Sequence, residues 1–332
     1  MSLEKKSFEI PVIHDFRGIA ALSVVLYHFV YTTTDYIQTE WVLDIFHFGR
    51  KGVQLFFIIS GIVIPLSMIK ASYQLPKIGK FLLRRFARIE PPFLVSLALG
   101  ILFLFARNYF PSAVQVDLSP SLRDIFLHFG YLVPFVSDAK WVLPVYWTLS
   151  IEFQYYLFLA ILFPLVMSKK PVLKWLFALI VIGIPLIFPV KVSFFPRWAP
   201  YFGLGIFYAM FLTKHFSLRE FLAAGILSIV MCLTVSKIEW VDIGLATVAI
   251  AVIHFFPYLT TKGGRFFGKI SYSLYLFHSL IGARFINFMS HRTTEAWEKF
   301  LVITVGVILA TITAYIVWKL VERPSQLLSK KV

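Results

Sequence analysis

The sequence predicts an all-α integral membrane protein with about ten transmembrane helices. Its residues are 59% hydrophobic and 15% charged, with 36 phenylalanines among 332 residues, and its mean hydropathy is +0.79. A soluble domain of this length could not bury so much apolar surface, so lipid must be the solvent for most of it. Most of its apolar segments are close to the twenty residues that cross a bilayer as a helix.

Ten such segments follow one another along the chain. They cover about residues 16–34, 52–70, 89–108, 143–167, 174–190, 198–213, 219–236, 241–259, 270–290 and 300–320. The fifth and sixth are short and contain glycine or proline, so their limits are the weakest. Because we find no repeat, low-complexity tract or soluble appended domain, a single membrane domain, residues 1–332, fills the chain. In the loop before the fourth segment, Ser121–Pro134 is predicted to form an amphipathic interfacial helix.

Charge predicts that both chain termini are cytoplasmic. With the N-terminus inside, 21 of the 32 lysines and arginines fall on the inner side, as the positive-inside rule requires. These are Lys5, Lys6, Arg17, Lys70, Lys77, Lys80, Arg84, Arg85, Arg88, Lys169, Lys170, Lys174, Lys214, Arg219, Lys262, Arg265, Lys269, Lys319, Arg323, Lys330 and Lys331. The long outer loop 109–141 instead carries the acidic residues Asp117, Asp124 and Asp138. Since the basic residues are spread over many loops, the net charge of +15 does not indicate a nucleic-acid site.

Two further features of the sequence bear on signal-peptide cleavage and on disulfide formation. The first apolar run starts near Ile19, lacks a small-residue cleavage site and is followed by nine more, so no cleavable signal peptide is expected. The single cysteine, Cys232, lies within a span and excludes an internal disulfide.

The first span carries two ionisable side chains on one face. Arg17 and His28 are eleven residues apart, which is almost three helical turns, or roughly 16 Å along the axis. Ionisable groups are costly in hydrocarbon, so two of them on one stripe indicate a site.

Arginines precede the third span. Arg85 and Arg88 are spaced i, i+3 and share a face of the incoming helix at the inner boundary. Guanidinium groups there suit a phosphate-bearing ligand, and ordinary positive-inside anchoring explains them as well.

Other polar residues lie inside apolar spans. Glu152, about two turns inside the outer end of the fourth span, is either neutralised by a basic neighbour or functional. We expect it to meet His28 in the outer half of the membrane and to orient the imidazole as a general base.

Ser60 and Gly61 in the second span fit a close helix contact or a site. His278, near mid-membrane on one side with Ser271 and Tyr275, fits a structural hydrogen bond or catalysis, whereas His254 is expected to be a satisfied core residue.

The residues together resemble the membrane-bound acyltransferase-3 family. The stretch from Arg17 to His28 is similar to its Arg-x10-His signature, and further similar pieces follow in the expected order. These are Phe56–Gly61, Arg85–Arg88 followed by a proline, Trp147–Glu152, Ser271–His278 and Glu322–Pro324. The resemblance covers about residues 13–324.

Glu90 departs from it, because relatives usually carry a neutral or aromatic residue there, and it is expected to soften the local positive field. The hydrolase-like extracytoplasmic domain that some relatives append is not found, so we expect transfer to be completed in the membrane domain or by a separate partner.

The resemblance implies an O-acyltransferase of the cytoplasmic (inner) membrane. Acetyl-CoA would be the usual acyl donor, and the acceptor would be a hydroxyl of an extracytoplasmic or lipid-linked glycan, as in polysaccharide modification. Arg17, Arg85 and Arg88 would hold the phosphates of CoA, while His28 would act as general base or carry the acyl group covalently. Ser60, Trp147, Tyr155, Ser271, Tyr275 and His278 would line the site.

Several points stay open at this level. No metal-ligand pattern is present, and the acceptor, the acyl length and the oligomeric state are not specified. A transporter or flippase of a lipid-linked glycan or an anionic lipid, without covalent chemistry, is the alternative function. The order of the motifs and the lack of an evident inverted repeat argue against it.

Overall fold

A computed structural model describes residues 10–32, 36–107 and 120–331, and these ranges are helical throughout apart from short connections. Asp117, Lys5 and Lys6 lie outside the described residues. The α-helices are α1 (Val12–Leu26), α2 (Glu40–His47), α3 (Gly52–Lys70), α4 (Ile78–Arg107), α5 (Leu122–Phe129), α6 (Trp147–Val166), α7 (Pro171–Gly183), α8 (Phe195–Leu212), α9 (Leu218–Thr234), α10 (Trp240–Phe255), α11 (Lys262–His278), α12 (Arg284–Ser290), α13 (Ala296–Val317) and α14 (Arg323–Lys331). The short helical segments are η1 (Tyr27–Tyr31), η2 (Phe48–Lys51), η3 (Leu75–Lys77), η4 (Val133–Phe135), η5 (Pro144–Tyr146), η6 (Ile184–Leu186), η7 (Ser279–Ala283) and η8 (Trp318–Glu322).

The all-α prediction is confirmed, and several helices have membrane dimensions. By length and composition, four helical stretches in the described ranges are long and apolar enough to cross a bilayer. They are Glu40–Lys70, Leu75–Ala106, Pro144–Val166 and Ala296–Lys331. The apolar helices Pro171–Leu186 and Trp240–Phe255 are shorter.

One predicted boundary is wrong. The third span was expected to begin near residue 89, but α4 starts at Ile78 and continues through Pro91 and Pro92. Each proline removes one backbone N–H, and neighbouring helices can compensate such a loss inside a membrane bundle. Here the two prolines free the carbonyls of Ala87 and Arg88, and Tyr272 of α11 donates its hydroxyl to the neighbouring carbonyl of Ile89 (2.8 Å). As a result, the arginines before residue 89 lie within a continuous helix.

The outer loop contains a shorter amphipathic helix than predicted. α5 covers Leu122–Phe129 and begins with a capping box in which Ser121 and Asp124 satisfy each other's backbone N–H groups. Leu122 and Phe126 on its outward face are 72% and 71% exposed. This apolar face agrees with an interfacial position.

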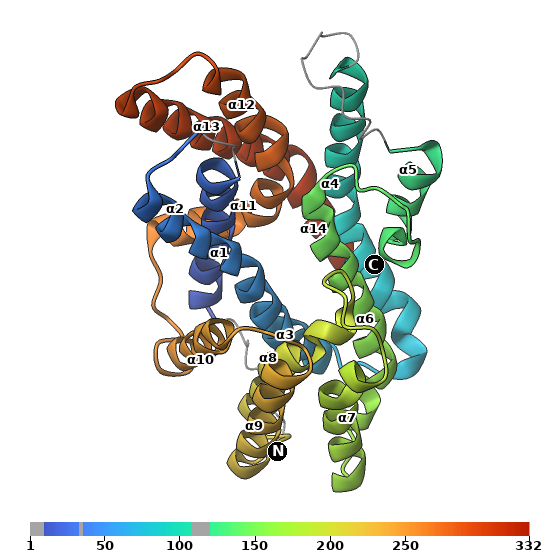
Figure 1. Ribbon diagram of the computed structural model, residues 1–332. Helices are drawn as coiled ribbons and strands as arrows, with labels where there is room; N and C mark the ends of the chain where they lie inside the picture. The colour runs from blue at the N-terminus through green and yellow to red at the C-terminus, as the bar shows by residue number, and fades with distance from the viewer. Residues whose placement is uncertain (1–9, 33–35, 108–119, 332) are drawn as a thin grey trace.

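Helices α1 and α11 lie side by side and run in the same direction (Figure 1). Gly264 and Gly268 of α11 face Gly18 and Asp15 of α1, and a Cβ atom added at Gly18 would lie 2.9 Å from the Gly264 carbonyl oxygen. Small residues at four-residue spacing allow this close approach. At the start of the pair, Asp15 accepts from the Thr261 backbone N–H (2.8 Å) at the N-cap of α11.

A second small-residue contact joins α3 to α8. A Cβ atom at Gly61 would lie 2.5 Å from the Phe202 carbonyl oxygen, and one at Gly205 would lie 2.6 Å from the Ile58 carbonyl oxygen. The packing interpretation is therefore confirmed for Gly61. In Figure 1, α8 to α10 gather around the lower end of α3, while α4 and α6 form the other side of the molecule.

The α1–α11 contact predicts the effect of a single methyl group. We expect Gly268→Ala to force the helices apart, because a Cβ atom there would overlap the His14 backbone. Overpacking of this kind costs about 1–3 kcal/mol, so the thermal unfolding midpoint in detergent should fall. Gly263→Ala is the matched control, since no atom lies within 4 Å of its added Cβ. Equal midpoints for the two variants would contradict the tight contact.

Candidate active site

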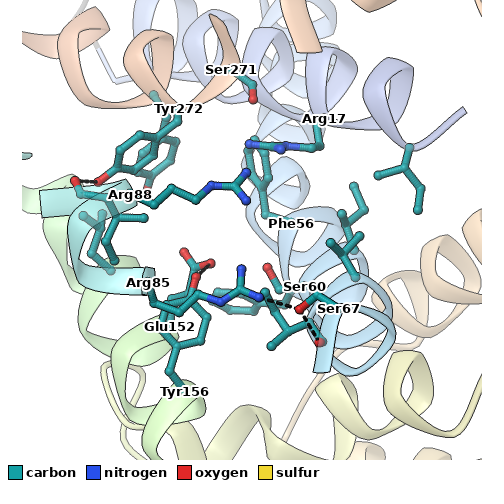
Figure 2. A pocket seen from close by; sticks show the side chains of 18 of the residues that line it. Arg17, Phe56, Ser60, Ser67, Arg85, Arg88, Glu152, Tyr156, Ser271 and Tyr272 are labelled. Atoms are coloured by element: carbon teal, nitrogen blue, oxygen red, sulfur yellow. Dashed lines mark hydrogen bonds between the residues drawn. The ribbon is translucent and has the colours of Figure 1, made fainter. Parts of the chain in front are cut away.

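The three arginines that the sequence predicted to bind a ligand, Arg17, Arg85 and Arg88, line one cavity between α1, α3, α4, α6 and α11. Its volume is about 370 Å³, within the range of about 300–1,000 Å³ that is typical of small-molecule sites. Figure 2 shows the side chains of Arg17 from α1 and of Arg85 and Arg88 from α4, all pointing into this space. The spacing argument that placed Arg85 and Arg88 on one helix face is confirmed.

The cavity lining has more positive than negative charge. Besides the three arginines it includes Lys70, and its carboxylates are Glu152 and Glu322, which leaves a surplus of two positive charges. Within the described ranges, no ion pair joins these arginines to either carboxylate. Guanidinium N–H groups therefore remain for an anionic ligand, in the geometry that suits phosphate.

A serine of α3 and two aromatic rings hold Arg85 in place. Its Nη2 donates to Ser67 Oγ of α3 (2.5 Å). Its guanidinium lies 5.3 Å from the ring centroid of Phe81 and 5.7 Å from that of Tyr156, within cation–π range. Arg85 is thus fixed at the wall of the cavity before any ligand binds.

Each carboxylate has its own neutral donors. Tyr156 donates its hydroxyl to Glu152. Glu322, which is 1% exposed, accepts from the Ser273 hydroxyl (2.6 Å) and backbone N–H (3.2 Å) and from Gln326 Nε2 (2.9 Å). Because hydroxyl and amide donors satisfy the carboxylates, they need not compete for the arginines.

Glu152 does not lie where the sequence predicted. Tyr146, just before α6, hydrogen-bonds Ser96 of α4 (2.8 Å). From that level α6 descends six residues to Glu152, roughly 9 Å, while antiparallel α4 descends eight residues to Arg88, roughly 12 Å. Glu152 is thus nearly level with Arg88 beside the arginines, and the expected pairing with His28 is wrong.

The reason is the path of the chain before α6. This segment was expected to be an outer loop, but it runs along α4 toward the end that carries the arginines. Tyr131 donates its hydroxyl to Glu90 (2.6 Å), and the Tyr131 carbonyl accepts from Ser150 Oγ (3.4 Å). α6 therefore starts deep in the bundle, which places Glu152 close to the level of Arg88.

His28 pairs with His278 instead. His28 Nδ1 lies 3.2 Å from His278 Nε2 and 2.9 Å from the Val24 carbonyl oxygen. His28 is in the π-helical segment η1, and His278 directly precedes the π-helical segment η7. Single π-helical turns inside helices are frequent at functional sites.

The cavity ends one turn before this histidine pair. Tyr275 and Thr148 both line it, and their hydroxyls are 2.8 Å apart. Tyr275 also donates to the Val145 carbonyl (3.0 Å), and its ring lies 6.0 Å from that of His278. The arginines and the histidines thus occupy successive levels along α1 and α11, separated by the Tyr275 side chain.

The remaining predicted lining residues divide into two groups. Ser60 and Ser271 line the cavity (Figure 2). Trp147 packs instead against Phe57 and Trp198, and buried Tyr155 donates to the Ser60 carbonyl (3.4 Å). Neither Trp147 nor Tyr155 contributes to the described cavity wall, so the prediction that they line it is wrong.

A family model described as an acyltransferase domain, Acyl_transf_3, matches residues 14–319. The chain belongs to the acyltransferase 3 family. It is therefore an acyltransferase and a multi-pass helical membrane protein. No solved structure gives a significant match.

Two similar proteins have names that refer to acetyl transfer. O-acetyltransferase OatA of Staphylococcus aureus is 25% identical over 367 aligned positions, which cover 95% of this chain and 57% of the relative. The putative acetyltransferase ORF330 of Acidianus two-tailed virus is 27% identical over 293 positions, covering 82% of this chain and 83% of the relative. The chain thus spans little more than half the length of the staphylococcal relatives that it matches.

Two predictions about single residues need correction. Glu90 was expected to soften the positive field at the arginines, but it is 3% exposed, accepts from Tyr131 and does not belong to the described cavity wall. His254 was expected in the core, but it is exposed at the end of α10 beside Tyr208.

Sequence reasoning missed four residues that shape the site. Glu322 and Tyr156 line the cavity, Tyr272 lines it from α11, and Asp15 fixes α11 against α1. Glu322 had a usable signal, because the Glu-Arg-Pro sequence belongs to the family resemblance. The others carried no signal, since tyrosine in an apolar helix and aspartate at a helix start are common for other reasons.

The arginine cluster predicts selective loss of donor binding. We expect Arg88→Ala to weaken acetyl-CoA binding about 10- to 100-fold, because hydrogen bonds to charged groups contribute about 1.5–3 kcal/mol each. Arg84→Ala removes the same charge from the same helix, but Arg84 does not line the cavity, so its affinity should stay within about twofold. Titration of purified protein with acetyl-CoA measures both. Equal losses of acetyl-CoA affinity in the two variants would indicate a general effect of charge and contradict a binding site in this cavity.

Proposed function

We propose that this acyltransferase transfers an acetyl or other short acyl group from cytoplasmic acyl-CoA to a hydroxyl of an extracytoplasmic or lipid-linked glycan. The observation that supports it is the succession, along one helix pair, of an arginine-lined cavity and a paired imidazole. The first suits a donor with several phosphates, and the second suits proton transfer from a hydroxyl. The printed names of the two relatives agree with acetyl as the group transferred.

The donor would enter from the inner side. The cavity lies next to the first turns of α1 and α4 and is lined by Lys70, all of which the charge distribution predicts to be cytoplasmic. We therefore propose that both termini and the arginines face the cytoplasm, in the cytoplasmic membrane, with about ten spans. Arg17, Arg85 and Arg88 would then hold the phosphates and orient the acyl thioester toward Tyr275.

His28 would act as the general base on the acceptor. As the hydroxyl oxygen bonds to the thioester carbonyl carbon, its proton passes to His28. The carbon–sulfur bond breaks, and the proton then goes to the CoA thiolate, which leaves as free CoA. A variant in which His28 itself carries the acyl group before the acceptor takes it balances equally. Glu152, which lies beside the arginines, would shape the donor site rather than orient the base.

The route between the two levels would pass Tyr275. This side chain is 7% exposed and ends the described cavity below His278. Its hydroxyl is held by Thr148 and by the Val145 carbonyl, so the route would open only when these hydrogen bonds break and the ring moves against its packing with Phe56. A moving side chain between donor and base would exclude water until both substrates are present.

Removing the imidazole should stop chemistry while preserving donor binding. For His28→Gln we expect CoA release in the presence of acceptor to fall by about 100-fold or more, the usual contribution of a general base. The affinity for acetyl-CoA should stay within about twofold, because His28 does not line the donor cavity. Single-turnover CoA release and equilibrium binding give the two quantities. A His28→Gln protein with wild-type turnover would overturn the catalytic role, and a wild-type protein that moves glycan without releasing CoA would favour a transporter.

A further inference from the structure

The hydrogen bonds around the two histidines determine which ring nitrogens carry protons. His28 Nδ1 lies 2.9 Å from the Val24 carbonyl oxygen, and His278 Nδ1 lies 2.7 Å from the Tyr275 carbonyl oxygen. A carbonyl oxygen only accepts, so in both rings Nδ1 must be the protonated nitrogen.

The same reasoning gives the direction of the contact between the rings. In a neutral imidazole only one nitrogen carries hydrogen, so with its proton on Nδ1, His278 presents Nε2 as an acceptor. His28 Nδ1–H, 3.2 Å away, can then be shared between this nitrogen and the Val24 carbonyl oxygen, which lies 2.9 Å from the same Nδ1. The Ser279 hydroxyl, 3.0 Å from the Nε2 of His278, is an alternative donor to its single lone pair. A doubly protonated His278 would instead direct an N–H at the N–H of His28, which is repulsive.

We propose that His278 is a positioning residue that, together with the Val24 carbonyl, holds His28 in the tautomer with a proton on Nδ1 and a basic Nε2. The inference rests on the proposed function, in which His28 is the base. When Nε2 of His28 takes the proton of the acceptor hydroxyl, the ring becomes an imidazolium, and its Nδ1–H is donated to His278 Nε2. The arrangement serves the same purpose as the carboxylate of a Ser-His-Asp triad, but its acceptor is neutral.

Burial supports a fixed rather than a passing contact. His278 is 0% exposed, and its Nδ1 has a second carbonyl, that of Leu274, at 3.2 Å. Gly282, in the segment that follows, leaves space for the Phe29 ring next to His28, because an added Cβ would overlap that ring. The backbone around both rings is thus packed for this orientation.

The test compares two substitutions at His278. Leucine has no acceptor, whereas the side-chain oxygen of glutamine can still accept from His28 Nδ1–H. We expect His278→Leu to lower kcat about 100-fold with an unchanged KM for acetyl-CoA, and His278→Gln to recover about ten- to thirtyfold, but not all, of that loss. His254→Leu, which removes an imidazole away from this pair, should leave kcat within about twofold.

The outcomes separate this proposal from the proposed function. If His28→Gln is inactive while His278→Leu turns over at the wild-type rate, the positioning role is overturned and the base assignment remains. If both His278 variants lose kcat equally and also raise KM, His278 is only structural and the proposal is overturned. If His28→Gln keeps wild-type turnover, the assignment of His28 as base and the positioning role of His278 are both overturned.

Folding failure of the leucine variant does not remove the test. A lowered unfolding midpoint would reveal it, and His278→Gln would then be decisive alone. For that variant we expect kcat to fall about three- to tenfold without change in KM, because an amide oxygen is a less well placed acceptor than imidazole Nε2. A wild-type kcat in a folded His278→Gln protein would contradict the inference.

Discussion

The close parallel contact between α1 and α11 is the constraint on which the site depends. Three glycines allow it, and Asp15 fixes its start by accepting from the N-cap of α11. Because the two helices then run alongside each other for four turns, residues at matching levels must meet. Arg17 of α1 therefore lines the same cavity as Ser271 and Tyr275 of α11, and His28 lies against His278. A change of register between these helices would separate both pairs at once.

The carboxylates that line the cavity are hydrogen-bonded without neutralising its arginines. Inside a membrane an unpaired charge is costly, and the simplest solution would be arginine–carboxylate pairs. Here tyrosine, serine and glutamine donors hold Glu152 and Glu322 instead. The arginines therefore keep a positive surplus that an anionic donor can complete on binding. The cavity is ready for a ligand because its carboxylates are already hydrogen-bonded.

Sequence periodicity predicted the parts of the site that depend on a single helix. The arginine spacings, the helical character of every apolar segment and the close contact at Gly61 follow from local patterns, and α3 has the predicted bounds. Features that depend on the path of the chain in space could not be predicted this way. The depth of Glu152 depends on the course of the segment after Tyr131 along α4, and the start of α4 depends on a helix that continues through two prolines. The pairing of His28 with His278 required the register of two helices that are 250 residues apart in the chain.

The central claim is that CoA and the paired imidazoles share one axis along α1 and α11. An electron cryomicroscopy map of the full chain in a lipid nanodisc with bound CoA tests it most directly. We predict density for the phosphates among Arg17, Arg85 and Arg88, with the thiol end directed at Tyr275 and the His28–His278 contact. Phosphate density elsewhere, or a thiol directed away from α1 and α11, would contradict the account of how donor and base are brought together.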